Sequence, residues 1–119
     1  NIVETVTVDY ESPYDVKWVY DGDTNTYKRI RGGEAEIDAN TGRQVQAGVV
    51  VVMRTTSRVL SIDYISVDTI GEGEAEFYQN GIKTTGAWKN NDNGLKFYDI
   101  NGQPIRFVPG KMWIEIVTK

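Results

Sequence analysis

Three acidic side chains at alternate positions give this chain its clearest arrangement for acid–base chemistry. They are Glu34, Glu36 and Asp38 in the stretch GGEAEID. If this segment is extended, all three lie on one face, because successive side chains of a strand point to opposite faces. Paired carboxylates act as general acid and base when their environments separate their pKa values. The alternative, which we favour, is a charged strand edge that discourages aggregation.

A second group of polar side chains lies just before these carboxylates, in the stretch TYKRIR. Tyr27, Arg29 and Arg31 alternate and therefore share one face of an extended segment. An arginine fork beside a tyrosine can hold a carboxylate or a phosphate. The same arginines can equally pair with Glu34 or Glu36, which predicts a cluster of surface ion pairs.

Trp88 is the first candidate for a functional aromatic side chain, with Lys89 beside it in the stretch GAWKNND. Gly86, two residues earlier, allows another backbone or a ligand to approach closely. Packing in the core remains the default interpretation for Trp88. Near the end of the chain, MWIEIV alternates, so we expect one set of side chains in the core and Trp113 on the outer face or under a loop.

Two short motifs resemble cofactor sites but fail on their spacing. DGDTN (21–25) places oxygen ligands as a calcium loop does, but such a loop needs glycine sixth and glutamate twelfth. Those positions hold Thr26 and Gly32 here. GEGEAE (71–76) contains Gly-x-Gly, but its three glutamates would repel a phosphate, so we expect a flexible turn between strands. The sequence therefore predicts no metal and no cofactor.

The composition removes several classes of function. The 119 residues include no cysteine and no histidine, which excludes thiolate sites and Ser-His or Cys-His catalysis. The net charge is −4 and the 13 basic residues are scattered, whereas tracking a phosphate backbone requires clustered cations. We therefore expect no nucleic acid partner. No apolar run approaches the roughly 20 residues that span a bilayer.

The pattern of strands and turns predicts an all-β fold. Stretches such as YDVKWVY alternate between apolar and polar residues, and VVVVM (49–53) is apolar on both faces, as in a central strand covered on both sides. Two Asn-Gly pairs, at 80–81 and 101–102, indicate type I′ hairpin turns. We predict a single domain over residues 1–119, an antiparallel sandwich or small barrel built from hairpins, with room for one short helix at 55–61 or 90–96.

The order of several pieces adds a family resemblance. WVYDGDTNTYKRIRGG, DANTG, VVVV, IGEGEAEFYQNGIKTTGAWK and FYDINGQPIRFVPGKMWIEIV follow one another over nearly the whole chain. This set resembles the C-terminal domain of the YerB-like bacterial lipoproteins, a family of unknown function from mostly Gram-positive lineages. The resemblance implies an extracytoplasmic parent protein with a lipid-anchored N-terminus and an N-terminal domain, neither in this chain. It implies no catalytic residue; relatives are expected to carry histidine where Glu36 stands.

Two hypotheses of function follow. The first is a non-catalytic interaction or scaffolding module of a bacterial envelope lipoprotein. Its partners would be the N-terminal domain of the parent, another envelope protein or a cell-wall component, and it would meet the membrane only through the parent's lipid anchor. The second is part of a carboxylate-dependent cell-wall hydrolase using Glu34, Glu36 or Asp38. The candidate binding surface comprises Tyr27, Arg29, Arg31, Glu36, Asp38, Trp88 and Lys89.

Overall fold

The protein is built from two β-sheets. The computed structural model describes residues 5–8, 16–55, 71–91 and 93–118, and this part of the chain contains ten strands and no helix. The strands of the first sheet are β1 (Thr5–Val8), β2 (Val16–Asp21), β3 (Thr26–Arg31), β4 (Glu34–Ala35) and β5 (Gln46–Ala47). Those of the second sheet are β6 (Val49–Thr55), β7 (Gly71–Gln79), β8 (Ile82–Asn91), β9 (Gly94–Asp99) and β10 (Met112–Thr118).

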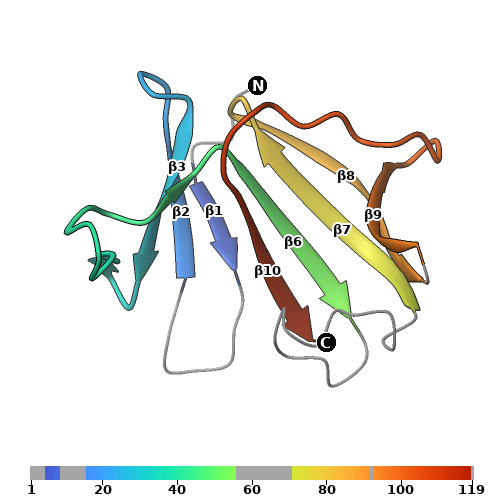
Figure 1. Ribbon diagram of the computed structural model, residues 1–119, viewed down its shortest axis with the longest axis horizontal. Coiled ribbons are helices and arrows are strands. Elements are labelled where there is room, and N and C mark those ends of the chain that lie inside the picture. The colour runs from blue at the N-terminus through green and yellow to red at the C-terminus, as the bar shows by residue number, and fades with distance from the viewer. Residues whose placement is uncertain (1–4, 9–15, 56–70, 92, 119) are drawn as a thin grey trace.

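The two sheets differ in their strand order. The first runs β1-β2-β3-β4, with β5 also paired to β3, and the second runs β10-β6-β7-β8-β9. Figure 1 shows the first sheet at the left and the second at the right, with the chain passing from β5 to β6 across the top. The described strands form open sheets and no closed barrel, so the all-β prediction is confirmed as a two-sheet arrangement.

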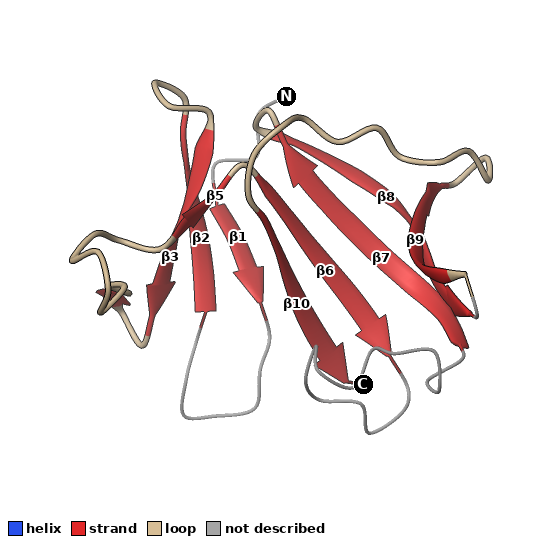
Figure 2. Ribbon diagram, in the orientation of Figure 1, coloured by secondary structure: helices blue, strands red, loops and turns tan. Residues whose placement is uncertain are grey.

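One strand pair departs from the predicted antiparallel pattern. β10 runs parallel to β6, with Met112 opposite Val49 and Ile116 opposite Met53. A parallel neighbour cannot be reached by a tight hairpin and needs a longer crossover. Here the segment 100–111 provides it by running from β9 across the second sheet, as Figure 2 shows. The stretch MWIEIV therefore forms an edge strand that pairs with β6, and it is not the second strand of a terminal hairpin.

β6 is the wall between two apolar cores. The prediction that its valines are covered on both faces is confirmed, since Val49 to Met53 are all at most 2% exposed. One face packs against the first sheet in an inter-sheet core, which we define by its buried members Val6, Val8, Val16, Trp18, Tyr27, Ala47, Val50, Val52, Tyr78 and Val117. The other face belongs to an outer core, defined by Val49, Val51, Met53, Ala75, Phe77, Trp88 and Ile116.

The outer core is covered by β9 and by the segment that follows it. Phe97 from β9 and Phe107 from the crossover meet the ring of Phe77 edge to face, with centroids 5.5 and 5.9 Å apart. The side chain of Gln79 holds the crossover by donating to the carbonyl of Arg106 and accepting from the N–H of Val108. The second sheet therefore has apolar cover on both of its faces.

This double cover corrects the prediction for β10. We expected Met112, Ile114 and Ile116 in the core and the alternate residues outside. Instead Val117 is buried in the inter-sheet core and Ile116 in the outer core, while Met112 is 36% exposed. Trp113 is half-buried and packs edge to face on Trp18 at 5.4 Å. The strand has two buried faces because both sides of its sheet are covered.

The Gly-x-Gly stretch is strand and not the flexible turn that we predicted. Gly71 and Gly73 begin β7, which pairs with β8 over its whole length. A Cβ on Gly73 would lie 2.7 Å from both the carbonyl of Arg54 and the indole nitrogen of Trp88. Glycine is therefore needed at position 73 because the Trp88 ring crosses the strand there.

The two Asn-Gly turns have different conformations. Asn80 and Gly81 join β7 to β8 with φ of 56° and 73°, which is the type I′ geometry that the sequence predicts. At the second pair only Gly102 has a positive φ, 80°, and the side chain of Asp99 accepts from the N–H groups of Asn101 and Gln103. That turn leads into the crossover and not into a new strand of the sheet.

The short helix that the sequence allowed is absent from the described part of its two candidate segments. Residues 90–91 and 94–96 belong to β8 and β9, which pair as a hairpin through Asn91 and Gly94. Most of the other segment, 56–61, lies outside the described residues. No described helix has the length and apolar character required to cross a membrane.

Candidate functional site

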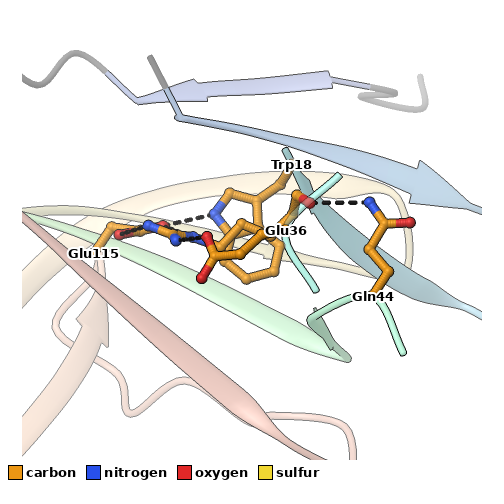
Figure 3. A network of polar contacts seen from close by, with 5 residues as sticks. Trp18, Glu36, Gln44 and Glu115 are labelled. Carbon is orange, nitrogen blue, oxygen red and sulfur yellow. Dashed lines mark hydrogen bonds and ion pairs between the residues drawn. The ribbon is translucent and has the colours of Figure 1, made fainter. Parts of the chain in front are cut away.

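The most concentrated polar arrangement in the described structure is centred on Arg29, between the two sheets. Its guanidinium meets Glu115 through two bonds, from Nε to Oε2 at 3.0 Å and from Nη2 to Oε1 at 3.3 Å. Its Nη1 also donates to Oε1 of Glu36. Figure 3 shows Glu36 and Glu115 converging beside the ring of Trp18. Arg29 thereby links β3 to β10 and to the residue that follows β4.

Two tryptophans enclose this ion-pair network. The Arg29 guanidinium carbon lies 4.8 Å from the ring centre of Trp113 and 5.7 Å from that of Trp18. The Trp18 indole N–H also donates to Oε2 of Glu115 at 2.8 Å. An aromatic face attracts a cation electrostatically, and the attraction grows as water is excluded. The rings therefore add to the stabilisation of the charge that the carboxylates provide.

The local backbone fixes Arg29 at this position. Its N–H donates to the carbonyl of Val45, and its own carbonyl accepts from the N–H of Glu36 and from the side-chain amide of Gln44. Figure 3 shows Gln44 reaching across to this carbonyl. The N–H and the C=O of Arg29 are thus both hydrogen-bonded, which fixes the backbone from which its side chain extends toward β10.

The electrostatics of the network favour a permanent ion pair. Burial opposes the charge on Arg29, but hydrogen bonds and attraction from Glu115 and then Glu36 outweigh it, and the pKa of Arg29 is raised above its ordinary value. Arg29 is only 7% exposed and Glu115 only 3%. Both carboxylates are engaged with the same cation, so the arrangement is suited to joining the sheets and not to transferring a proton.

Trp88 lies in the outer core, away from this network. It is 4% exposed, and its indole N–H donates to the carbonyl of Arg54 at 3.0 Å. Gly86 allows the close backbone approach that the sequence predicts, because a Cβ there would lie 2.0 Å from the carbonyl of Tyr98. The neighbouring Lys89 is exposed and its amine lies 5.6 Å from the ring centre of Tyr98. The default interpretation of Trp88, core packing, is therefore the one observed.

The residues of the predicted binding surface do not form one surface. Tyr27, Arg29 and Trp88 are buried, Glu36 and Asp38 are partly exposed, and Arg31 and Lys89 are exposed. Tyr27 and Arg29 share a face, as predicted, but that face of β3 is the interior one. The predicted surface ion-pair cluster is corrected accordingly: the pair of Arg29 with Glu36 exists, and it lies against the core.

The three alternating carboxylates differ in their surroundings. β4 covers only Glu34 and Ala35, Glu36 turns to Arg29, and Asp38 begins a loop in which its side chain accepts from the N–H of Asn40. The loop then closes through a bond from the N–H of Gly42 to the carbonyl of Asp38. The turn thus follows Asp38, and residues 36–38 before it stay paired with 43–45 through the bridge of Ile37 with Gln44.

The stretch DGDTN is the tip of the β2–β3 hairpin. Asp21 forms a salt bridge with Lys28 at 3.0 Å, and the hydrogen bond from Lys28 lowers the pKa of the Asp21 carboxyl. Asn25 takes a positive φ of 54°, donates to Asn80 and accepts from the Tyr20 hydroxyl. Among the described residues, no group of three side chains is placed to hold a metal ion.

Glu115 is the central residue that the sequence analysis missed. It interrupts the apolar run MWIEIV, and an acidic residue at an alternate position of a strand ordinarily faces solvent. An acidic residue between two isoleucines on a strand with two apolar faces is the signal that was available. Its buried partner, Arg29, lies 86 residues earlier in the chain and becomes visible only in the folded structure.

The fold and this cross-sheet ion pair define an open two-sheet β protein held together by a buried arginine. Residues 6–114 match the model of the DUF3048 C-terminal domain, described as a protein of unknown function, and the chain belongs to that family. No curated protein matches the sequence.

A solved structure shares the fold. The crystal structure of the YerB protein from Bacillus subtilis aligns with a TM-score of 0.77 and 24% sequence identity, over 97% of this chain. The chain spans 40% of the length of that protein. The resemblance predicted from the ordered motifs is therefore confirmed: this is a YerB-like C-terminal domain of unknown function.

Proposed function

We propose that this domain is a non-catalytic interaction or scaffolding module of an extracytoplasmic bacterial lipoprotein. The single observation that carries the proposal is that two acidic side chains between the sheets have a structural role. Glu36 and Glu115 both bind Arg29 between the sheets. A carboxylate that holds a permanent cation is a poor proton donor, so Glu36 is unsuited to be the general acid of a carboxylate-dependent hydrolase.

The first partner that we propose is the rest of the parent protein. The support is the length of the YerB chain, of which this domain matches 40%. A domain with its own two cores folds as a unit and offers its exterior to a neighbouring domain. Another envelope protein or a cell-wall component is the second class of partner, and a lipid anchor on the parent would bring the domain to the membrane.

The exposed members of the candidate surface are the ones available for contact. Arg31 and Lys89 can reach a partner directly, and Glu36 and Asp38, which are partly exposed, do so only at their exposed edges. Tyr27, Arg29 and Trp88 would act through the shape of the domain. Variants of the exposed residues therefore test binding, and variants of the buried ones test stability.

An assay of wall turnover separates the module from the hydrolase. The full-length parent is incubated with purified cell wall, and soluble reducing ends and free amino groups are measured over time. We expect no release above the blank, for the native protein and for Glu36→Gln alike. Release that Glu36→Gln or Asp38→Asn abolishes would establish the hydrolase and reject the proposed function.

A binding experiment tests the interaction directly. The domain is immobilised and exposed to detergent-solubilised envelopes and, separately, to the remainder of its parent protein. We expect saturable capture of one of them, weakened by Arg31→Ala/Lys89→Ala. Thr5→Ala, an exposed change on the distant β1, is the matched control. The absence of saturable binding to either preparation would contradict a role in interaction.

A further inference from the structure

A groove of about 650 Å³ lies between four segments of the chain, and two of its lining residues, Gln44 and Val45, bond to the backbone of Arg29. One wall is the tip of the β2–β3 hairpin, residues 24–26; a second is the segment 43–48; the third is the turn 108–111; and Asp38 and Thr41 complete the lining. Val45 and Val108 are half-buried in it, each packed against one of the two cores. The groove therefore rests on both cores and has a fixed floor.

The segment 43–48 is extended and its bonds to the first sheet lie along one edge only. Val45 donates to the carbonyl of Glu36 and accepts from the N–H of Arg29, and Ala47 is the partner of Tyr27. Further along, the N–H of Gly48 donates to the carbonyl of Lys111 on the opposite edge. In a strand, the N–H and C=O groups of successive residues point to opposite edges.

This alternation fixes where the remaining backbone groups point. Because Val45 and Ala47 are directed toward β3, the N–H and C=O of Gln44 and Gln46 are directed away from it, into the groove. An outward row of backbone donors and acceptors is a template for pairing with another extended chain. The groove thus offers two residues of strand edge, Gln44 and Gln46, over a half-buried apolar floor.

The charged side chains beside this edge favour a ligand of negative charge. Arg43 and Lys111, both exposed, lie at its two ends, and Asp38 is the single acidic residue of the lining. The Asp38 carboxylate already accepts from the N–H of Asn40. The domain as a whole carries a charge of −4, whereas the lining of this groove holds two cations and one acid. The described lining contains no aromatic ring on which a sugar could stack.

We propose that this groove binds an extended acidic polypeptide segment by strand addition to Gln44 and Gln46. The inference rests on the proposed function and specifies its ligand class. Main-chain bonds to the edge supply affinity, and carboxylates placed near Arg43 and Lys111 supply specificity. A segment of five residues spans roughly 16 Å when extended, enough to cover the edge from one cation to the other.

The probe is the capped pentapeptide acetyl-Glu-Val-Glu-Val-Glu-amide, titrated into the 15N-labelled domain. We expect saturable shifts of the amides of residues 43–48 and 110–111, and at least a tenfold weaker affinity for the peptide with lysine in place of glutamate. Equal affinity for both peptides, or shifts confined to other residues, would overturn the proposal.

Two variants separate edge pairing from charge. Gln46→Pro removes the N–H that points into the groove and leaves the bonds of Val45 and Ala47 intact, since proline is tolerated on the outward side of an edge. Arg43→Ala/Lys111→Ala removes the cations and changes no backbone group. We expect each to weaken binding at least tenfold with an unchanged thermal midpoint, whereas Lys17→Ala/Lys96→Ala, which removes two exposed cations outside both the groove and the candidate surface, binds as the native domain. If the two groove variants bind the acidic peptide as tightly as the native domain does, the assignment is wrong.

The same experiment distinguishes failure of the groove from failure of the proposed function. If the pentapeptide does not bind and Gln46→Pro still captures the domain's partner, the groove assignment falls and the interaction module stands. If an acidic oligosaccharide shifts the groove amides while the peptide shifts none, the ligand class proposed here is wrong.

Discussion

The two faces of the second sheet carry cores of different character. Toward the first sheet, the apolar side chains surround an arginine and a glutamate, each almost fully buried, which meet between two tryptophans. On the other face, three phenylalanines meet edge to face under the crossover segment. The charged side chains that are buried in the described structure, Arg29 and Glu115, both belong to the inter-sheet side.

The two cores hold the second sheet in place by different kinds of interaction. Packing of rings is tolerant of small shifts, because dispersion is shared among many weak contacts. A buried ion pair has directional bonds, and its charges are costly to separate. The inter-sheet core therefore fixes the position of one sheet relative to the other, whereas the outer core mainly excludes water from the second sheet.

The largest effect is expected in the outer core. Phe77→Ala removes a fully buried ring that touches Phe97 and Phe107, and we expect the free energy of unfolding to fall by about 4 kcal/mol because a cavity remains. Urea denaturation followed by fluorescence measures it. Phe107→Leu, at a half-buried ring, is the control, with an expected loss below about 1.5 kcal/mol. Equal losses would mean that Phe77 is not the centre of this core.

The inter-sheet core should respond differently to single and paired changes. Arg29→Met leaves Glu115 buried without its cation, and we expect a loss of about 3 kcal/mol. Arg29→Met/Glu115→Met removes both buried charges and should recover most of that loss, because the carboxylate left without its cation is Glu36, which is partly exposed to water. Additive losses in this double-mutant cycle would show that the two side chains are not coupled.

A smaller loss of stability is expected where the Trp88 ring lies against β7, and it should depend on which glycine is replaced. Gly73→Ala places a Cβ against the Arg54 carbonyl and the Trp88 indole, and we expect a loss of about 2 kcal/mol from overpacking. Gly71→Ala on the same strand meets Trp88 only at 3.5 Å and should change stability by less than about 0.5 kcal/mol. Thermal unfolding of the two variants compares them, and identical midpoints would refute the crossing of the ring over Gly73.

The last effect is absent at neutral pH, because it is an alkaline limit on the stability of the inter-sheet core. Burial raises the pKa of Tyr27 and of Tyr78 to about 12, above the ordinary 10.0. Since the folded state keeps these protons longer than the unfolded state, their contribution is complete below pH 10 and is lost as the pH rises through 12.

Absorbance at alkaline pH measures this titration in the native protein. We expect two of the tyrosines to ionise last, and Tyr78→Phe to remove one of them and to flatten the loss of stability above pH 10. A titration in which Tyr78→Phe loses an early-ionising group would contradict its burial. The outer core supplies the contrast, since its defining residues have no ionisable side chain.

Much of the fold could be predicted from local patterns. The alternation around Trp18, the valines of β6 and the Asn80–Gly81 turn each depend on neighbours in sequence, and each was correct. The site was not predictable in the same way. Alternation alone predicts Arg29 and Glu115 at the surface, because a charged residue in an alternating strand ordinarily faces water. Only a partner 86 residues away makes burial favourable for them.

The sequence by itself determined the secondary structure class, the hairpin at 80–81 and the family, because each depends on the local order of residues. The tertiary structure decided which face of each strand is interior, the parallel pairing of β10 with β6, and the burial of the ion pair. The physical reason is that the alternation of side chains gives a strand two faces but does not determine which face is buried. Only the packing of the first sheet on one side, and of the crossover on the other, removes water from both.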